Sequence, residues 1–115
     1  MVKRKNELKT TVNEQMRGGS GSVLIEHILD GEGLYGKGRL YANVVLKPGC
    51  SVGFHVHEGE MESYFITKGA AEYDDNGTKV RLAVGDSTYT PDGEGHGITN
   101  IGEGDLEFVA LIIYS

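Results

Sequence analysis

From residue 22 onward, about nine short runs of β-forming residues alternate with turns. The runs occupy 22–30, 39–46, 51–57, 61–67, 70–75, 79–84, 87–90, 97–101 and 106–114. Each is bounded by glycine, proline or Asn-Gly, and no stretch keeps a 3.6-residue apolar period over three turns. The pattern predicts an all-β sandwich or barrel.

The first 21 residues are polar and run into the glycine-rich sequence "RGGSGS". We expect residues 1–21 to form an N-terminal arm with a helical turn at its centre, and residues 22–115 to form one β-barrel domain. Within that domain, Asn76-Gly77 supplies the two positive-φ residues of a tight hairpin turn.

Alternation along the strands predicts which side chains face the same way. Gly53, His55 and His57 are expected on one side of their strand, with the apolar residues of the run on the other: Val52, Phe54 and Val56. The last strand, 106–114, carries large apolar residues at both parities. Burial of both faces in so small a domain predicts a homodimer, with coverage by the arm as the alternative.

Composition narrows the class of protein. The net charge of −6 argues against a nucleic-acid or anionic-membrane partner, because both require clustered Lys and Arg. The eighteen glycines accompany only two prolines, which is typical of turns between strands. The one cysteine, Cys50, cannot form an intrachain disulfide and is expected to be a small buried apolar residue. With no apolar run long enough for a signal or a membrane span, a soluble cytoplasmic protein is predicted.

Two of the four histidines stand two apart in "GFHVHEGEMESYF". A His-x-His strand places both rings on one face, and Glu62 opens the next strand, opposite the pair. His96, in the glycine-rich "PDGEGHGITN", can supply a fourth ligand. Each feature alone carries little weight, but together they favour a metal site. Imidazole and carboxylate ligands suit Fe, Mn, Ni, Zn or Cu.

Two segments resemble the first and second motifs of the cupin superfamily. The first, "GCSVGFHVHEGEMESYFITKG", and the second, "GDSTYTPDGEGHGITN", match at every defining position: Gly49, His55, His57, Glu62, Gly69, Gly85, Pro91, Gly93, His96 and Asn100. The resemblance implies a double-stranded β-helix, a jelly-roll barrel that holds one divalent transition metal. It further implies that His55, His57, Glu62 and His96 are the ligands and that the motif glycines and proline shape turns.

The superfamily includes dioxygenases, isomerases, decarboxylases, sugar sensors and storage proteins, so function has to come from the site. A metal with open positions favours a metalloenzyme acting on a small oxygenated metabolite by dioxygenase, isomerase or decarboxylase chemistry. The alternative is a non-catalytic module that binds a sugar or a carboxylic acid. Tyr64 is the candidate proton donor, with Met61, Ile66 and Ile98 as further pocket residues. No inward-facing cation can be assigned, which disfavours sugar phosphates as ligands.

Three other features are set aside. "GEGLYG", residues 31–36, matches a nucleotide-binding pattern, but a strand follows it where a helix is required. "NGT", residues 76–78, is explained by the hairpin. His27 either lines the pocket or, as we expect, has a local partner on its strand.

Overall fold

The computed structural model covers residues 1–115 and consists of strands joined by turns. The ten strands are β1 (Lys9–Glu14), β2 (Ser22–Leu29), β3 (Gly38–Leu46), β4 (Ser51–Val56), β5 (Glu60–Lys68), β6 (Ala71–Asp75), β7 (Thr78–Leu82), β8 (Ser87–Thr90), β9 (Gly95–Asn100) and β10 (Leu106–Tyr114). The only helices are three short 3-10 turns: η1 (Lys5–Glu7), η2 (Met16–Gly18) and η3 (Gly31–Leu34). None of these turns has the length or the apolar character needed to cross a bilayer.

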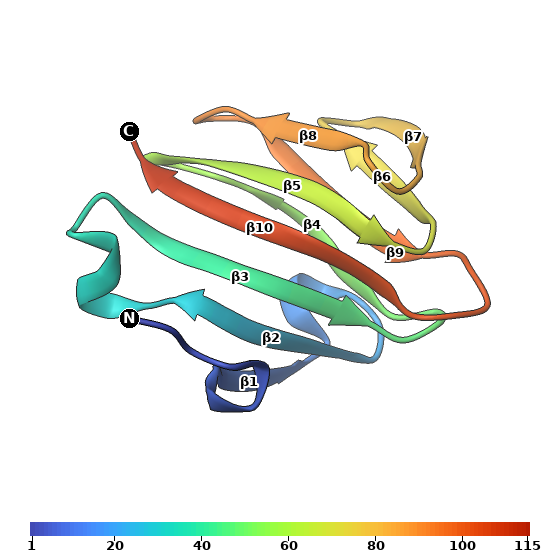
Figure 1. Cartoon of the computed structure of the whole chain (residues 1–115). Coiled ribbons are helices and arrows are strands. Elements are labelled where there is room, and N and C mark those ends of the chain that lie inside the picture. Colours follow the sequence, from blue (N-terminus) through green and yellow to red (C-terminus); the bar gives the residue numbers. More distant parts are fainter.

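Two antiparallel sheets face each other (Figure 1). One has the order β1-β2-β3-β10-β5-β8 and the other β4-β9-β6-β7. β10 pairs with both β3 and β5, so the end of the chain lies at the centre of the larger sheet. The predicted all-β, double-stranded β-helix is confirmed.

The core lies between the sheets. The larger sheet contributes residues of four strands, among them Leu46, Ile66, Leu106 and Phe108, each fully buried. The smaller sheet contributes Val52, Ala71, Tyr73 and Ile98. Buried side chains alternate with outward ones along β10, which is the period expected for a strand with one face in the core.

The predicted alternation on β4 is wrong at Val52, which is only 5% exposed and belongs to the core. Val52 pairs with Ile98, and His55 pairs with His96, so Gly53 and Phe54 stand opposite a single residue of β9. This is a β-bulge, which adds one residue to a strand and shifts its alternation. Val52 and His55 therefore both face inward, while the Phe54 and Val56 side chains are about half exposed.

The first residues of the chain contain a strand that the hydrophobic pattern does not predict. β1 pairs antiparallel with β2 and forms the edge of the larger sheet. Only Thr11 in β1 is even half-buried. Such a polar strand carries no apolar alternation for sequence reasoning to detect. The division into an arm up to residue 21 and a barrel from residue 22 stays a prediction.

The predicted hairpin at Asn76-Gly77 is confirmed. Asp75 pairs with Thr78, and the two residues between them have φ values of 49° and 104°. The Asp74 carboxylate accepts a hydrogen bond from the Gly77 N–H at 2.7 Å and closes the turn.

Candidate metal centre

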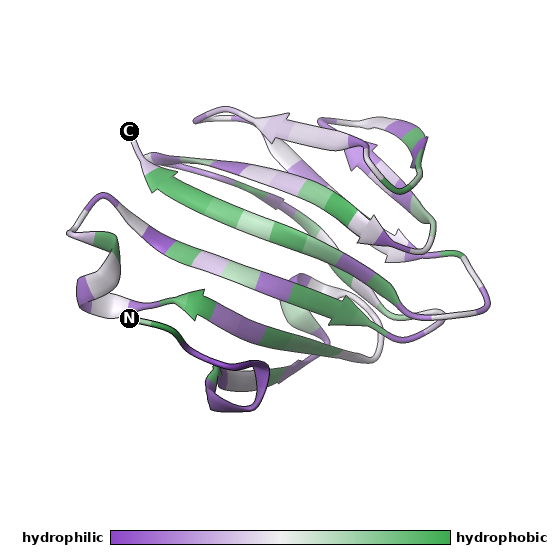
Figure 2. Ribbon diagram, viewed as in Figure 1, coloured by the Kyte–Doolittle hydropathy of each residue, from purple (hydrophilic) through white to green (hydrophobic).

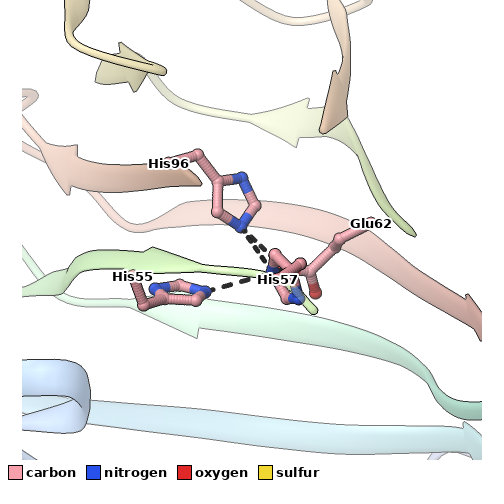
Figure 3. A group of neighbouring side chains, drawn as sticks. All are labelled: His55, His57, Glu62 and His96. Atoms are coloured by element: carbon pink, nitrogen blue, oxygen red, sulfur yellow. Dashed lines mark hydrogen bonds and ion pairs between the residues drawn. The ribbon is translucent and has the colours of Figure 1, made fainter. Parts of the chain in front are cut away.

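Four side chains from three segments converge between the two sheets (Figure 3). His55 lies on β4 and His57 directly follows it, Glu62 lies on β5, and His96 lies on β9 opposite His55. One ligand atom from each lies within 4.8 Å of every other, and His57, Glu62 and His96 are buried. The four residues singled out in the sequence are therefore brought together and can hold a metal ion.

The ring nitrogens named Nε2 point at a common centre. His57 Nε2 and His96 Nε2 each lie 2.9 Å from Glu62 Oε1 and 3.0 Å from each other. His55 Nε2 lies 4.0 Å from the same carboxylate oxygen. Three imidazoles and one carboxylate thus present their donor atoms to one small volume.

The opposite ring nitrogen, Nδ1, is held by a separate partner in each histidine. His55 Nδ1 lies 2.7 Å from the Gly53 carbonyl oxygen, and His57 Nδ1 lies 2.6 Å from Glu60 Oε2. His96 Nδ1 lies 2.7 Å from the Tyr73 hydroxyl and 3.0 Å from that of Thr90. Outer partners of this kind fix the orientation of metal-binding histidines.

The chemistry of these contacts fits a cation. A carbonyl and an ionised carboxylate can only accept, so His55 and His57 must donate from Nδ1. In the neutral ring this leaves Nε2 with a lone pair, and both lone pairs face the Glu62 carboxylate. Electron pairs brought together in a buried site require a positive charge among them, which a divalent metal would supply in the loaded protein and protons on the imidazoles supply in its absence.

Glu60 and Arg39 are functional candidates that the sequence reasoning missed. Arg39 donates to both Glu60 oxygens, at 2.7 and 2.8 Å, and Glu60 in turn accepts from His57. The hydrogen bond from Arg39 lowers the pKa of the Glu60 carboxyl, and the bond from His57 adds to this. The "EGE" segment suggests a turn only. A carboxylate three residues after a candidate ligand was the available signal.

Replacing Glu60 by glutamine should weaken metal binding. The amide is neutral, so it no longer orients His57 by a charged hydrogen bond, and Arg39 loses its partner. Loss of such an outer partner costs about 10- to 100-fold in metal affinity. Titration calorimetry with Mn²⁺ measures the effect. Glu58→Gln, an exposed change in the turn that precedes β5, is the control, and equal affinities in the two variants would contradict the role given to Glu60.

Tyr64 lies on β5 beside the candidate ligands. Its ring stacks on that of His96, with centroids 4.9 Å apart, and packs on Phe108. Burial raises the pKa of the Tyr64 hydroxyl well above 10, and the nearby Glu62 charge raises it further. Tyr64 therefore keeps its proton at neutral pH and can donate a hydrogen bond, but it cannot serve as a base. Its catalytic role remains a prediction.

A cavity of about 340 Å³ contains the site, and its wall includes the arm. Three candidate ligands, His55, His57 and Glu62, line it together with Tyr64 and with residues of β1 and η2: Lys9, Thr11, Asn13, Met16 and Arg17. His27 also lines it and lies 3.2 Å from the Thr11 hydroxyl, so it has a local partner as well. The other expected pocket residues, Met61, Ile66 and Ile98, do not line it. Arg39, which could not be assigned an inward position from the sequence, lines the cavity in the structure.

The charge state of Glu62 makes the stability of the metal-free protein depend on pH in the acid range. Burial raises the pKa of the Glu62 carboxyl, but hydrogen bonds from His57 and His96, together with their charge, outweigh burial and hold it at about 2. The folded-state pKa lies below the ordinary 4.5, so the stabilisation is present above pH 4.5 and is lost as the pH falls towards 2.

We expect metal-free wild type to lose on the order of 3 kcal/mol more than Glu62→Gln across this pH window. Urea unfolding at a series of pH values, after removal of metal by dialysis, measures both proteins. Parallel pH profiles for the two would show that Glu62 does not make this contribution.

Comparison with known proteins defines the class. Residues 42–114 match the cupin domain family, and the chain belongs to it. An oxalate-binding protein of Thermotoga maritima is 46% identical over 113 residues, which span 98% of this chain and 93% of that protein. A crystal structure described as a predicted oxalate decarboxylase from the same organism superposes with a TM-score of 0.95 at 45% identity, over 100% of both chains.

More distant structures share the fold alone. KdgF from Halomonas sp. superposes with a TM-score of 0.70 at 22% identity, over 81% of this chain and 79% of that one. The jelly-roll barrel is therefore common to proteins of differing description, and the site has to carry the functional argument.

Proposed function

We propose that the protein holds one divalent transition metal through His55, His57, Glu62 and His96 and binds a small dicarboxylate there, with oxalate as the ligand to test. The observation that carries the proposal is the convergence of four donor atoms within 4.8 Å. The descriptions of the Thermotoga protein and of the Thermotoga crystal structure support the choice of oxalate. Four protein ligands leave positions open on a six-coordinate ion, and a chelating acid fills two of them.

The charge of the cavity favours an anion. Three cations line it, Lys9, Arg17 and Arg39, against the single carboxylate of Glu62. The bound metal would add two further positive charges. At about 340 Å³ the cavity is near the lower end of small-molecule sites, which suits a compact ligand.

As an enzyme, the protein would decarboxylate oxalate at this site. Cleavage of the C–C bond of oxalate releases carbon dioxide, and the remaining carbon must take up a proton to become formate. The metal would act as a Lewis acid that polarises the substrate oxygens. Tyr64 is the candidate source of the proton, because its hydroxyl is protonated and the residue lines the cavity.

The test separates binding from catalysis. Metal-free protein is loaded with Mn²⁺ or Co²⁺, and oxalate binding is measured by calorimetry with and without metal, using acetate and a neutral sugar as comparison ligands. We expect oxalate binding that depends on metal. Formate release under air or nitrogen would identify a decarboxylase, and its absence would identify a binding protein. Metal-loaded protein that fails to bind oxalate would overturn the proposal.

The proposal includes a homodimer formed through the outer face of the larger sheet. β10 is hydrophobic along most of its length (Figure 2). On the outer face Val109 lies beside Phe65, and Leu111 lies beside Tyr41. Phe65 is 49% exposed, so this apolar row is uncovered in one chain. The same face of a second copy can pack against this row and bury it in a two-fold symmetric interface.

Light scattering coupled to gel filtration tests the dimer. We expect wild type to run at twice its 12.4 kDa mass and Val109→Glu to run as a monomer. Val56→Glu, a change on the outer face of the other sheet, is the matched control and should leave the dimer intact. A monomeric wild type would rule out this interface.

A further inference from the structure

The turn η2 carries an arginine to the cavity through an unusual backbone. Gln15 and Arg17 both adopt left-handed conformations, with φ of 50° and 55°. Residues other than glycine rarely adopt this backbone region, because it brings Cβ too close to the following carbonyl oxygen and costs free energy. The turn is held by hydrogen bonds from Gly18 N to Gln15 O and from Gly19 N to Met16 O, each 3.0 Å. Met16 packs against the core.

The turn η2 packs directly against β4, the strand that carries His55. A Cβ atom at Gly53 would lie 2.1 Å from the Arg17 carbonyl oxygen, so only glycine permits this approach. The Gly53 carbonyl is also the acceptor for His55 Nδ1. The backbone of Arg17 is therefore positioned against the same residue that orients one candidate ligand.

Arg17 is the one cation of the cavity whose side chain has no partner in the protein. Lys9 lies 3.8 Å from an Asp30 carboxylate oxygen, and Arg39 lies 2.7 Å from Glu60. Arg17 is exposed, its guanidinium forms no ion pair or hydrogen bond with the protein, and the residue lines the same cavity as His55, His57 and Glu62.

We propose that Arg17 binds the two carboxylate oxygens of the bound acid that point away from the metal. It would thereby select dicarboxylates over monocarboxylates. This inference rests on the proposed function. A dicarboxylate chelated through one oxygen of each carboxylate presents its other two oxygens side by side. The planar guanidinium offers two parallel N–H donors at a matching spacing, and a lysine ammonium does not. A monocarboxylate leaves no such pair for Arg17 to contact.

Three variants test the role of Arg17 in metal-loaded protein: Arg17→Gln, Arg17→Lys and the control Arg81→Gln. Arg81 lies on β7, away from the cavity, and also lacks an ion pair. We expect Arg17→Gln to lower oxalate affinity by about 10- to 100-fold, the effect of losing charged hydrogen bonds. Arg17→Lys should fall between this variant and wild type. Metal affinity and acetate affinity should stay at their wild-type values in all three.

The outcomes separate this inference from the function on which it rests. If wild type binds oxalate only with metal and Arg17→Gln binds it equally well, the role of Arg17 is wrong and the proposed function stands. A parallel loss of oxalate and acetate affinity, or a loss of metal affinity, would show that Arg17 acts on the fold or the metal site and would also overturn it. If metal-loaded wild type binds no oxalate, both proposals fail.

Discussion

Replacing His96 by alanine should lower the affinity for Mn²⁺ or Co²⁺ by more than about 100-fold. Loss of an outer partner alone costs 10- to 100-fold, and His96 is itself a candidate ligand. The ring is completely buried and held through Nδ1 by Tyr73 and Thr90, so no other side chain can replace it. His57 and Glu62 would keep their contact, but the donor set would lose one of its three nitrogens.

Competition with a chelator of known affinity measures the metal affinity. Thermal unfolding gives a second readout, since a metal present at 1,000 times its Kd stabilises the folded state by about 4 kcal/mol. That metal-dependent gain should vanish in His96→Ala. His27→Ala is the matched control, because His27 is the one histidine outside the group of four. Equal loss in both variants would contradict the assignment of His96 as a ligand.

Phe108→Ala should be the most destabilising single truncation among the residues beside the cavity. Phe108 is completely buried at the centre of the larger sheet, and its ring centroid lies 4.4 Å from that of Tyr64. Removing a buried aromatic ring leaves a void that close-packed neighbours fill only in part, at a cost of about 3–5 kcal/mol. Tyr64 would lose the surface that holds it against His96.

Urea unfolding followed by circular dichroism measures this loss in the free energy of unfolding. Phe54→Ala is the matched control, because Phe54 is 49% exposed on the outer face of the smaller sheet. Its truncation should cost far less. The prediction for Phe108 would be wrong if both variants unfolded at the same urea concentration.

The hydrophobic pattern and the motif spacing account for most of this fold. Nine of the strands fall on runs that alternate or are apolar, and the Asn76-Gly77 turn follows from local chemistry alone. The convergence of His55, His57, Glu62 and His96 is also foreseen, since the motif spacing fixes three segments relative to one barrel. Their role as metal ligands is a proposal that the metal titrations test.

What the sequence does not reveal depends on contacts between distant residues. The bulge at Gly53 and Phe54 shifts the alternation of inward and outward side chains on β4 by one residue. It can be recognised only from the pairing of β4 with β9. Arg39 meets Glu60 from a different strand, 21 residues earlier in the chain. Arg17 reaches the cavity because its turn rests on Gly53. None of these three contacts leaves a periodic signal.

The polar character of β1 bears on how a ligand reaches the interior. No side chain of β1 is fully buried, whereas β10 buries Leu106, Phe108, Ala110 and Ile112. An edge strand fastened mainly by backbone hydrogen bonds separates from its sheet at a far smaller free-energy cost than a central one. We therefore expect β1, which lines the cavity, to open more readily than the strands that carry the histidines.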